Sequence, residues 1–214
     1  MSYMEQTIDF VKKELEGAEA GHDWFHIERV YKNALHLLKT EQADEQVVLL
    51  GALLHDIADS KFHEGDETIG PKKAYDFMTT IEIPEDVKKH VVQIIENISF
   101  KGGNFEKDFR SKELEIVQDA DRLDAIGAIG IARTFNYGGF KNHPLYDPAI
   151  KPNLQMSKDE YKKHQGTTIN HFYEKLLLLR DLMNTETGKK MALKRHQYME
   201  GFLEQFYAEW NGQI

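Results

Sequence analysis

The sequence contains no cysteine. Disulfide bonds, thiolate metal sites and a cysteine nucleophile are therefore excluded. Its longest apolar runs are about half the roughly 20 residues that a membrane-spanning helix needs. The first residues, Met-Ser-Tyr-Met-Glu-Gln, also lack the basic and apolar regions of a signal peptide. We therefore expect a soluble, cytoplasmic protein that has no membrane partner.

Basic residues are outnumbered by acidic ones. Lys and Arg total 27 against 36 Asp and Glu, which gives a net charge of −9. A surface of this charge repels long nucleic acids. A small anion is repelled less, because a bound cation can set the local electrostatic field at its binding site. The composition favours a small phosphorylated substrate over a polymer, and it is compatible with a homo-oligomer.

Helical periodicity runs through nearly the whole sequence, with no internal repeat and no alternating strand pattern longer than a few residues. A chain of 214 residues, 41% of them hydrophobic, fits one domain with a packed core. We predict an all-α fold and a single domain over residues 1–214. Its core spans about 20–135, an excursion spans 137–166, and closing helices span 167–210.

The expected helices follow from apolar residues at helical spacing and from their flanking caps. They cover residues 3–16, 23–39, 44–57, 70–81, 84–96, 112–123, 125–136, 167–183 and 187–210. After a cap at Asp44, the segment 44–57 is apolar almost all round, which is typical of a central buried helix. Glycine and proline in 101–111 and 137–166 indicate loops, which could act as lids.

Two polar residues, His55 and Asp56, follow directly on the apolar run 47–54. Adjacent residues of a helix point about 100° apart, so both can face an ion at the helix edge. A histidine in this place is more often a hydrogen-bonded core residue than a ligand. A buried carboxylate without a partner is costly, however, so Asp56 requires a cation. A metal ion would satisfy it, and so would a salt bridge to Arg29 or Arg122.

Further ligand types stand on other segments. His26 lies 29 residues before His55, and Asp121 lies 65 residues after Asp56. Nitrogen and oxygen ligands from three segments can surround one divalent cation. Asp59 falls on the same helix face as His55, four residues later, where it could orient or deprotonate an attacking water.

Three residues compete for these ligand positions: His22 with His26, and Asp119 and Asp124 with Asp121. The phrase His-Asp-x-x-His at 22–26 also resembles the zinc-protease signature, but Asp23 stands where that chemistry uses Glu. Since no further zinc-protease partner is evident downstream, we do not favour a protease.

Three phrases carry a resemblance to a known family. They are His22-Asp-Trp-Phe-His26-Ile-Glu-Arg29, Leu53-Leu-His55-Asp56-Ile-Ala-Asp59-Ser-Lys61 and Asp119-Ala-Asp121-Arg122-Leu-Asp124. In this order they resemble the H…HD…D pattern of the HD-domain metal-dependent phosphohydrolases, and in particular a bacterial subgroup of small stand-alone hydrolases. The similarity extends into Arg133-Thr-Phe-Asn and His171-Phe-Tyr-Glu-Lys175.

The resemblance implies an all-helical fold in which His26, His55, Asp56 and Asp121 hold one divalent ion. A second ion is not expected, because only His63 and His90 lie between the His-Asp pair and the last aspartate. Imidazole and carboxylate ligands together suit Mn²⁺, Fe²⁺, Co²⁺, Ni²⁺ or Zn²⁺ better than Ca²⁺, with Mg²⁺ as a further candidate.

Cationic side chains should hold the phosphate oxygens of a substrate. Lys61 follows Asp59 closely, Arg122 adjoins Asp121, and Arg29 shares a helix face with His26. Arg133 is the fourth candidate, and Lys101, Lys175 and Arg195 are further ones. For any basic residue, a solvated position or a carboxylate partner is the more common environment.

The family includes nucleotide phosphatases, nucleoside triphosphate pyrophosphohydrolases, cyclic-nucleotide phosphodiesterases and guanosine-polyphosphate hydrolases. A small stand-alone domain with one metal most resembles the nucleotide hydrolases. We therefore expect pyrophosphohydrolysis of a (deoxy)nucleoside triphosphate, with a nucleoside monophosphate phosphatase, or another phosphomonoesterase or phosphodiesterase, as the alternative. A non-catalytic nucleotide-sensing HD module is the alternative from another class, and Asp59 argues against it.

Overall fold

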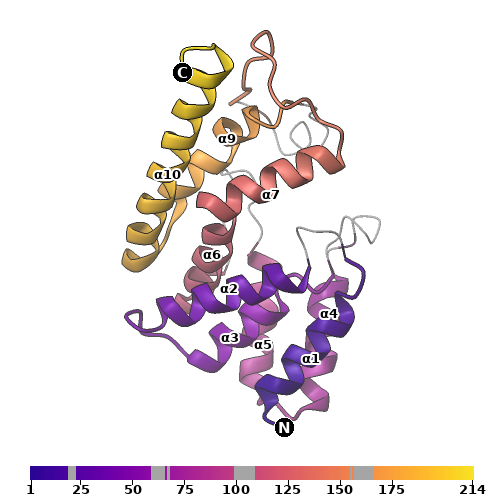
Figure 1. Ribbon diagram of the computed structural model, residues 1–214. Coiled ribbons are helices and arrows are strands. Elements are labelled where there is room, and N and C mark those ends of the chain that lie inside the picture. Colours follow the sequence, from indigo (N-terminus) through magenta and orange to yellow (C-terminus); the bar gives the residue numbers. More distant parts are fainter. Residues whose placement is uncertain (19–22, 59–65, 67, 99–108, 155, 157–165) are drawn as a thin grey trace. The chain divides into compact units, whose positions relative to one another are not determined.

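The computed structural model describes residues 1–18, 23–58, 66, 68–98, 109–154, 156 and 166–214 (Figure 1). All regular elements in these ranges are helices, and no strand occurs among them. The predicted all-α fold is confirmed. None of the helices in these ranges is both long and apolar enough to cross a membrane.

The chain forms two compact units, an N-terminal unit of residues 1–121 and a C-terminal unit of residues 122–214. The boundary falls inside helix α6 (Lys112–Asp124). The assignment of residues 1–214 to one domain stays a prediction.

The N-terminal unit is built around one buried helix. Its elements are α1 (Tyr3–Glu14), α2 (Trp24–Leu37), α3 (Glu45–Leu54), α4 (Ile69–Thr80), α5 (Glu85–Asn97) and most of α6. Every residue of α3 from Val47 to Leu54 is buried, and this helix packs against α1, α2 and α5. The near-continuous apolar run therefore forms the predicted central helix, because it has neighbours on several sides.

Aspartate side chains fix the starts of two helices in this unit. The predicted cap, Asp44, accepts a hydrogen bond of 3.2 Å from the backbone N–H of Val47. At α2, Asp23 accepts one of 2.9 Å from the N–H of His26. Each bond satisfies a backbone donor that a helix start leaves without an intrahelical acceptor. Asp23 is thus a capping residue, which accounts for the His-Asp-x-x-His phrase without protease chemistry.

The C-terminal unit contains α7 (Gly127–Phe140), α9 (Asn170–Glu174), the 3-10 helix η2 (Leu176–Leu182) and α10 (Glu186–Trp210). Helix α10 packs against α7 and η2. Aromatic rings fill the space between these elements: Phe172 stacks on Phe202 with ring centroids 5.8 Å apart, and Phe135 contacts both rings.

Two predicted boundaries in this unit are wrong. Helix α7 continues to Phe140, so residues 137–140 belong to a helix and not to the excursion. Gly138 and Gly139 suggested a loop, but Gly138 allows close packing: a Cβ atom there would lie 2.3 Å from Oγ1 of Thr168. The segment 167–183 is not one helix either, because Lys175, at φ −142° and ψ −58°, separates α9 from η2. In η2, Leu176 and Leu179 are both buried, a spacing of three that suits a 3-10 turn.

Candidate metal centre

His55 directly follows the last residue of the central helix, and one of its ring nitrogens is already engaged. Nδ1 lies 2.9 Å from the carbonyl oxygen of Ala52, one turn earlier on α3. A carbonyl only accepts, so Nδ1 carries the hydrogen and donates it. The lone pair of a neutral ring is then on Nε2, and the bond also fixes the ring plane. The His55 side chain is 5% exposed, so Nε2 is presented inside the unit rather than to bulk water.

His26 reaches the same place from the first turn of α2. It is buried, and the Asp23 cap fixes the backbone from which its ring projects. The two imidazole rings lie with centroids 5.4 Å apart at an interplanar angle of 72°. His26, His55 and Asp56 each offer a ligand atom, and these atoms all lie within 4.8 Å of one another.

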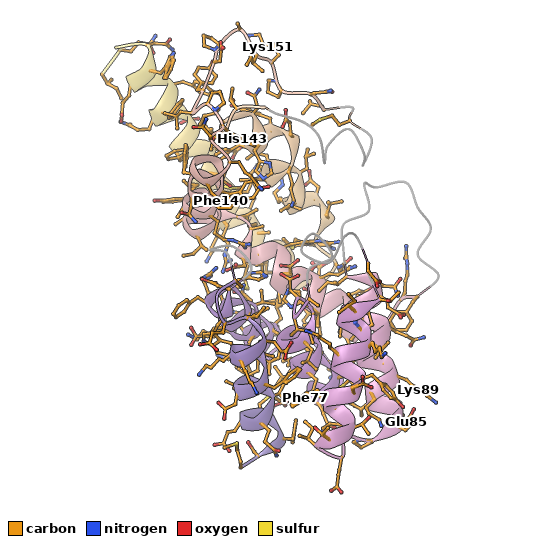
Figure 2. The ribbon with its side chains drawn as sticks, turned by 90° about the vertical axis from the view of Figure 1, so that its right-hand side faces the viewer. Phe77, Glu85, Lys89, Phe140, His143 and Lys151 are labelled. Carbon is orange, nitrogen blue, oxygen red and sulfur yellow. The ribbon has the colours of Figure 1, made fainter. Side chains whose placement is uncertain are left out.

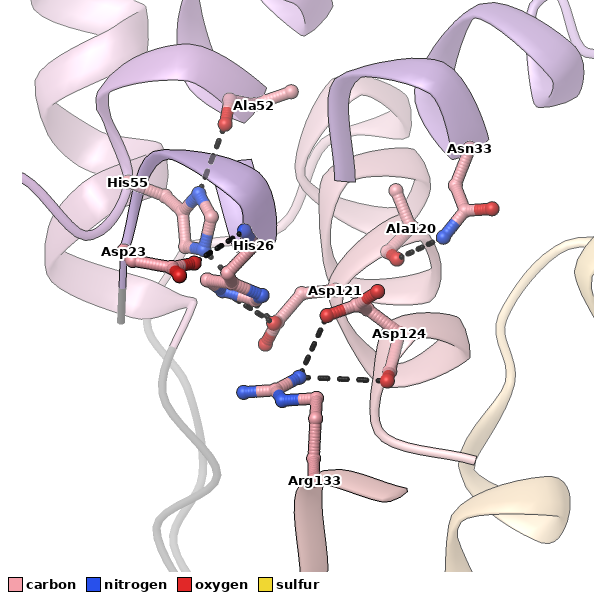
Figure 3. Close-up of polar contacts among 9 residues, drawn as sticks. All are labelled: Asp23, His26, Asn33, Ala52, His55, Ala120, Asp121, Asp124 and Arg133. Carbon is pink, nitrogen blue, oxygen red and sulfur yellow. Dashed lines mark hydrogen bonds and ion pairs between the residues drawn. The ribbon is translucent and has the colours of Figure 1, made fainter. Parts of the chain in front are cut away.

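Asp121 on α6 brings a further carboxylate to the two imidazoles. Its Oδ1 lies 3.6 Å from Nε2 of His26 and 3.9 Å from Nε2 of His55 (Figure 3). A hydrogen bond joins α6 to α2 next to Asp121: the side-chain amide of Asn33 donates to the carbonyl oxygen of Ala120 at 3.0 Å. No sequence pattern pointed to Asn33, because its partner is 87 residues away.

The spacing of these donor atoms fits one cation. Both Asp121 distances exceed the 2.7 to 3.2 Å range of an N–H···O hydrogen bond. Ligand atoms about 2.0 to 2.2 Å from a common ion lie roughly 3 to 4 Å from one another. Two imidazoles and two carboxylates form a nitrogen and oxygen donor set with two negative charges, which suits a divalent transition metal. These four residues could therefore hold the predicted ion.

The competing aspartates of α6 have other surroundings. Asp124 is buried and accepts a 2.7 Å hydrogen bond from Nη1 of Arg133. Asp119 is buried as well. Asp121 is the aspartate of α6 for which an approach to both imidazoles is observed. The other competitor, His22, lies outside the described residues.

The predicted catalytic and phosphate-binding residues remain predictions. Asp59 and Lys61 lie outside the described residues. Arg29 is half-buried on α2, one turn after His26. Arg122 donates from Nη1 to the carbonyl oxygen of Leu182, and Arg133 pairs with Asp124 as described above.

Comparison with known proteins identifies the family. The model of the HD domain matches residues 24–126, a range that includes all four candidate ligands. Over 202 residues the chain is 37% identical to the uncharacterized protein YpgQ of Bacillus subtilis, with 94% of this chain and 90% of YpgQ covered. The crystal structure of an HD-superfamily hydrolase from Bacillus thuringiensis superposes with a TM-score of 0.78 at 46% identity, covering 97% of this chain and 96% of that one. The chain belongs to the HD superfamily.

Membership confirms the predicted class of enzyme, a metal-dependent phosphohydrolase. One similar solved structure contains a bound nucleotide. The crystal structure of Bacillus subtilis YpgQ in complex with ADP superposes on this HD hydrolase with a TM-score of 0.74 at 35% identity, covering 96% of this chain and 97% of that one.

Proposed function

We propose that this HD hydrolase acts on a small nucleotide, and that its reaction is pyrophosphohydrolysis of a (deoxy)nucleoside triphosphate. The observation that carries the proposal is the convergence of His26, His55 and Asp56 with Asp121. Such a donor set suits a divalent metal, and a nucleotide is a small anion that a protein of net charge −9 can bind beside a cation.

His26, His55, Asp56 and Asp121 would hold the ion. When bound, a divalent ion lowers the pKa of water and neutralises charge that develops on a phosphate. Ala52 and Asp23 contribute by orienting the two histidines, through the bonds to Nδ1 of His55 and to the backbone of His26. Loss of such orienting groups typically costs metal affinity or activity.

In the proposed reaction, the oxygen of a water molecule bonds to the α-phosphorus, and the bond from that phosphorus to the α,β-bridging oxygen breaks. The electron pair leaves with pyrophosphate. We assign to Asp59, four residues after His55 in the sequence, the role of accepting a proton from the attacking water. Arg29 and Lys61 are the cations proposed to hold the non-bridging phosphate oxygens, with Arg122 and Arg133 as further candidates.

The choice of substrate is supported by the relative that binds ADP. YpgQ in that structure holds a nucleoside with two linked phosphates. A site that accepts linked phosphates favours a nucleoside polyphosphate substrate over a nucleoside monophosphate. A phosphate chain also provides the α,β-bridge that pyrophosphohydrolysis cleaves.

The deciding experiment incubates the purified, Mn²⁺-supplemented protein with the eight common ribo- and deoxyribonucleoside triphosphates and with the monophosphates. Pyrophosphate and orthophosphate are resolved by ion chromatography. We expect pyrophosphate and a nucleoside monophosphate in equal amounts from at least one triphosphate. Orthophosphate from monophosphates would instead support the phosphatase alternative, and nucleotide binding without any product would support a sensing module.

A further inference from the structure

Asp121 stands where α6 leaves the N-terminal unit. It is the last residue of that unit, and its side chain is 39% exposed, whereas those of His26 and His55 are 3% and 5% exposed. The packing of α2 and α3 therefore fixes the two imidazoles. A carboxylate at the edge of the unit has less packing around it, so its position depends on how the neighbouring backbone of α6 is held.

The backbone next to Asp121 is held by Asn33. The side-chain amide of Asn33 donates to the carbonyl oxygen of Ala120 at 3.0 Å, and Ala120 directly precedes Asp121. A carbonyl oxygen has two lone pairs, so it can accept this bond in addition to one within the helix. The same planar peptide group contains the backbone nitrogen of Asp121. A bond that fixes the carbonyl oxygen therefore also fixes the start of the ligand residue.

Asn33 and His26 lie on the same helix. They are seven residues apart on α2, close to two turns of 3.6 residues, and so share one face. On this face Nε2 of His26 lies 3.6 Å from Oδ1 of Asp121, and the amide of Asn33 meets the preceding peptide group (Figure 3). The two contacts together set the position of α6 along α2, and with it the distance from the carboxylate to the imidazoles.

A bond of this kind can also stabilise a fold without any effect on a site. Gln118 of α6 is an example: its buried amide donates at 3.1 Å to the carbonyl oxygen of Asn97, the last residue of α5. A helix end leaves such a carbonyl without an intrahelical donor, so this bond is accounted for by capping. The bond from Asn33 differs, because its acceptor belongs to the peptide group that joins a candidate ligand to its helix.

We propose that Asn33 is a positioning residue of the metal centre, which acts through the Ala120 peptide group to place the carboxylate of Asp121 for the ion. Loss of a group that orients a metal ligand typically changes metal affinity by about 10- to 100-fold. The inference rests on the part of the proposed function that assigns a divalent ion to this centre, and not on the choice of a nucleotide as substrate.

The test titrates the metal-free full chain with Co²⁺ and follows the visible absorption bands of the bound ion. Asn33→Leu keeps the size of the side chain but removes its donor. We expect its dissociation constant to rise about tenfold, and its Co²⁺ bands to change, because these bands report the number and geometry of the ligands. If Asn33→Leu does not fold, Asn33→Ser takes its place, since the serine hydroxyl ends one bond short of the amide nitrogen.

Phe77→Leu is the control for stability. The ring of Phe77 on α4 stacks on the ring of Phe10 on α1, with centroids 4.0 Å apart, inside the N-terminal unit (Figure 2). Neither helix carries a candidate ligand, so this variant should lower the midpoint of urea unfolding without changing the dissociation constant for Co²⁺. A loss of affinity as large as that of Asn33→Leu would mean that reduced stability alone explains both, and would overturn the inference.

A double-mutant cycle shows whether Asn33 acts through Asp121. In the Asp121→Ala background, Asn33→Leu should not weaken Co²⁺ binding further, because the ligand that it positions is already absent. The same loss in both backgrounds, or unchanged affinity in Asn33→Leu, would contradict the positioning role. Nucleotide hydrolysis together with unchanged affinity in Asn33→Leu refutes this role alone, whereas the expected affinities without hydrolysis of any nucleotide refute the proposed function alone.

Discussion

Nη1 of Arg133 donates a 2.7 Å hydrogen bond to Oδ2 of Asp124, a side chain that is only 2% exposed. The same Nη1 lies 3.4 Å from the backbone carbonyl oxygen of Asp124. Arg195 adds a hydrogen bond to the carbonyl oxygen of Leu123 and an electrostatic attraction to Asp124. Residues 123–124 are thus tied to α7 and α10. Arg133, a candidate for phosphate binding, has the carboxylate partner that basic residues commonly acquire.

Removal of this arginine should destabilise the C-terminal unit. Arg133→Ala takes the hydrogen-bonded partner from a buried carboxylate, which typically costs about 3 to 5 kcal/mol. Because Arg195 also attracts Asp124, we expect a loss nearer 2 to 3 kcal/mol in urea unfolding. Arg180→Ala, which removes a half-buried arginine that pairs with its exposed neighbour Asp181, is the control and should leave the midpoint unchanged. Equal midpoints for the two variants would show that the Arg133–Asp124 pair does not stabilise the fold.

Loss of a single candidate ligand should remove the metal. His26→Ala and His55→Ala each delete one imidazole from the donor cluster, so we expect metal content, measured by elemental analysis after dialysis, to fall at least about tenfold. His36→Ala on the same helix as His26 removes an exposed histidine and should retain full metal content. Full occupancy in either ligand variant would exclude that residue from the metal centre.

Asp59→Asn should separate metal binding from turnover. If Asp59 accepts the proton of the attacking water, its amide variant retains the metal but loses about 10²- to 10⁴-fold in kcat. Asp9→Asn, which changes an exposed aspartate of α1, should alter neither quantity. A loss of metal in the Asp59 variant would make this residue a ligand, and an unchanged kcat would remove it from the mechanism.

The helical fold could be predicted from local information, because apolar spacing specifies the helices. That His26, His55, Asp56 and Asp121 would meet was expected from the resemblance to the ordered H…HD…D motif, because the residues alone left a buried salt bridge open. The central helix is the clearest case, since its run of apolar residues leaves no polar face. Orientation within the site could not be predicted in the same way. Asn33 acts through a backbone carbonyl 87 residues away, which no sequence spacing encodes.

The C-terminal unit was predicted less well, because tertiary packing overrides its local signals. The glycine at position 138 predicted a loop, but Gly138 lies in helix α7. The close approach of Thr168 requires a residue without a Cβ at this position. The turn after α7 is also fixed by distant partners: the N–H groups of Thr168 and Ile169 donate to the carbonyl oxygens of Pro144 and Leu145. Such pairings become visible only once the chain is folded.

Acid should destabilise the protein through His171. Its pKa is 6.5 in the ordinary case and about 3 in the fold, where burial and then the charges of Lys175 and His143 lower it. Below pH 6.5 the unfolded state binds a proton that the folded state does not. The free energy of unfolding therefore falls as pH decreases from about 6.5 to about 3, by at most about 1.4 kcal/mol per pH unit.

The substitution His171→Gln isolates this contribution. Urea unfolding measured at several pH values between 4 and 7 should show a shallower dependence in the variant than in the parent protein. His36→Gln, which changes an exposed histidine, should leave the slope as it is. If the His171 variant kept the parent's slope, the ring would have to titrate near its ordinary pKa in the folded state.

Two glycines of α7 should respond in opposite directions to the same substitution. A Cβ at Gly130 would lie 2.2 Å from the carbonyl oxygen of Ala125, a backbone atom that cannot move aside cheaply. We expect Gly130→Ala to destabilise the protein by about 3 kcal/mol, at the upper end of the range for overpacking. A Cβ at Gly139 meets nothing within 4 Å. Gly139→Ala should therefore stabilise the helix by about 0.5 kcal/mol, because alanine restricts the unfolded chain and favours helix. Thermal unfolding of both variants checks this, and a stable Gly130→Ala protein would mean that α7 does not start as closely against Ala125 as described.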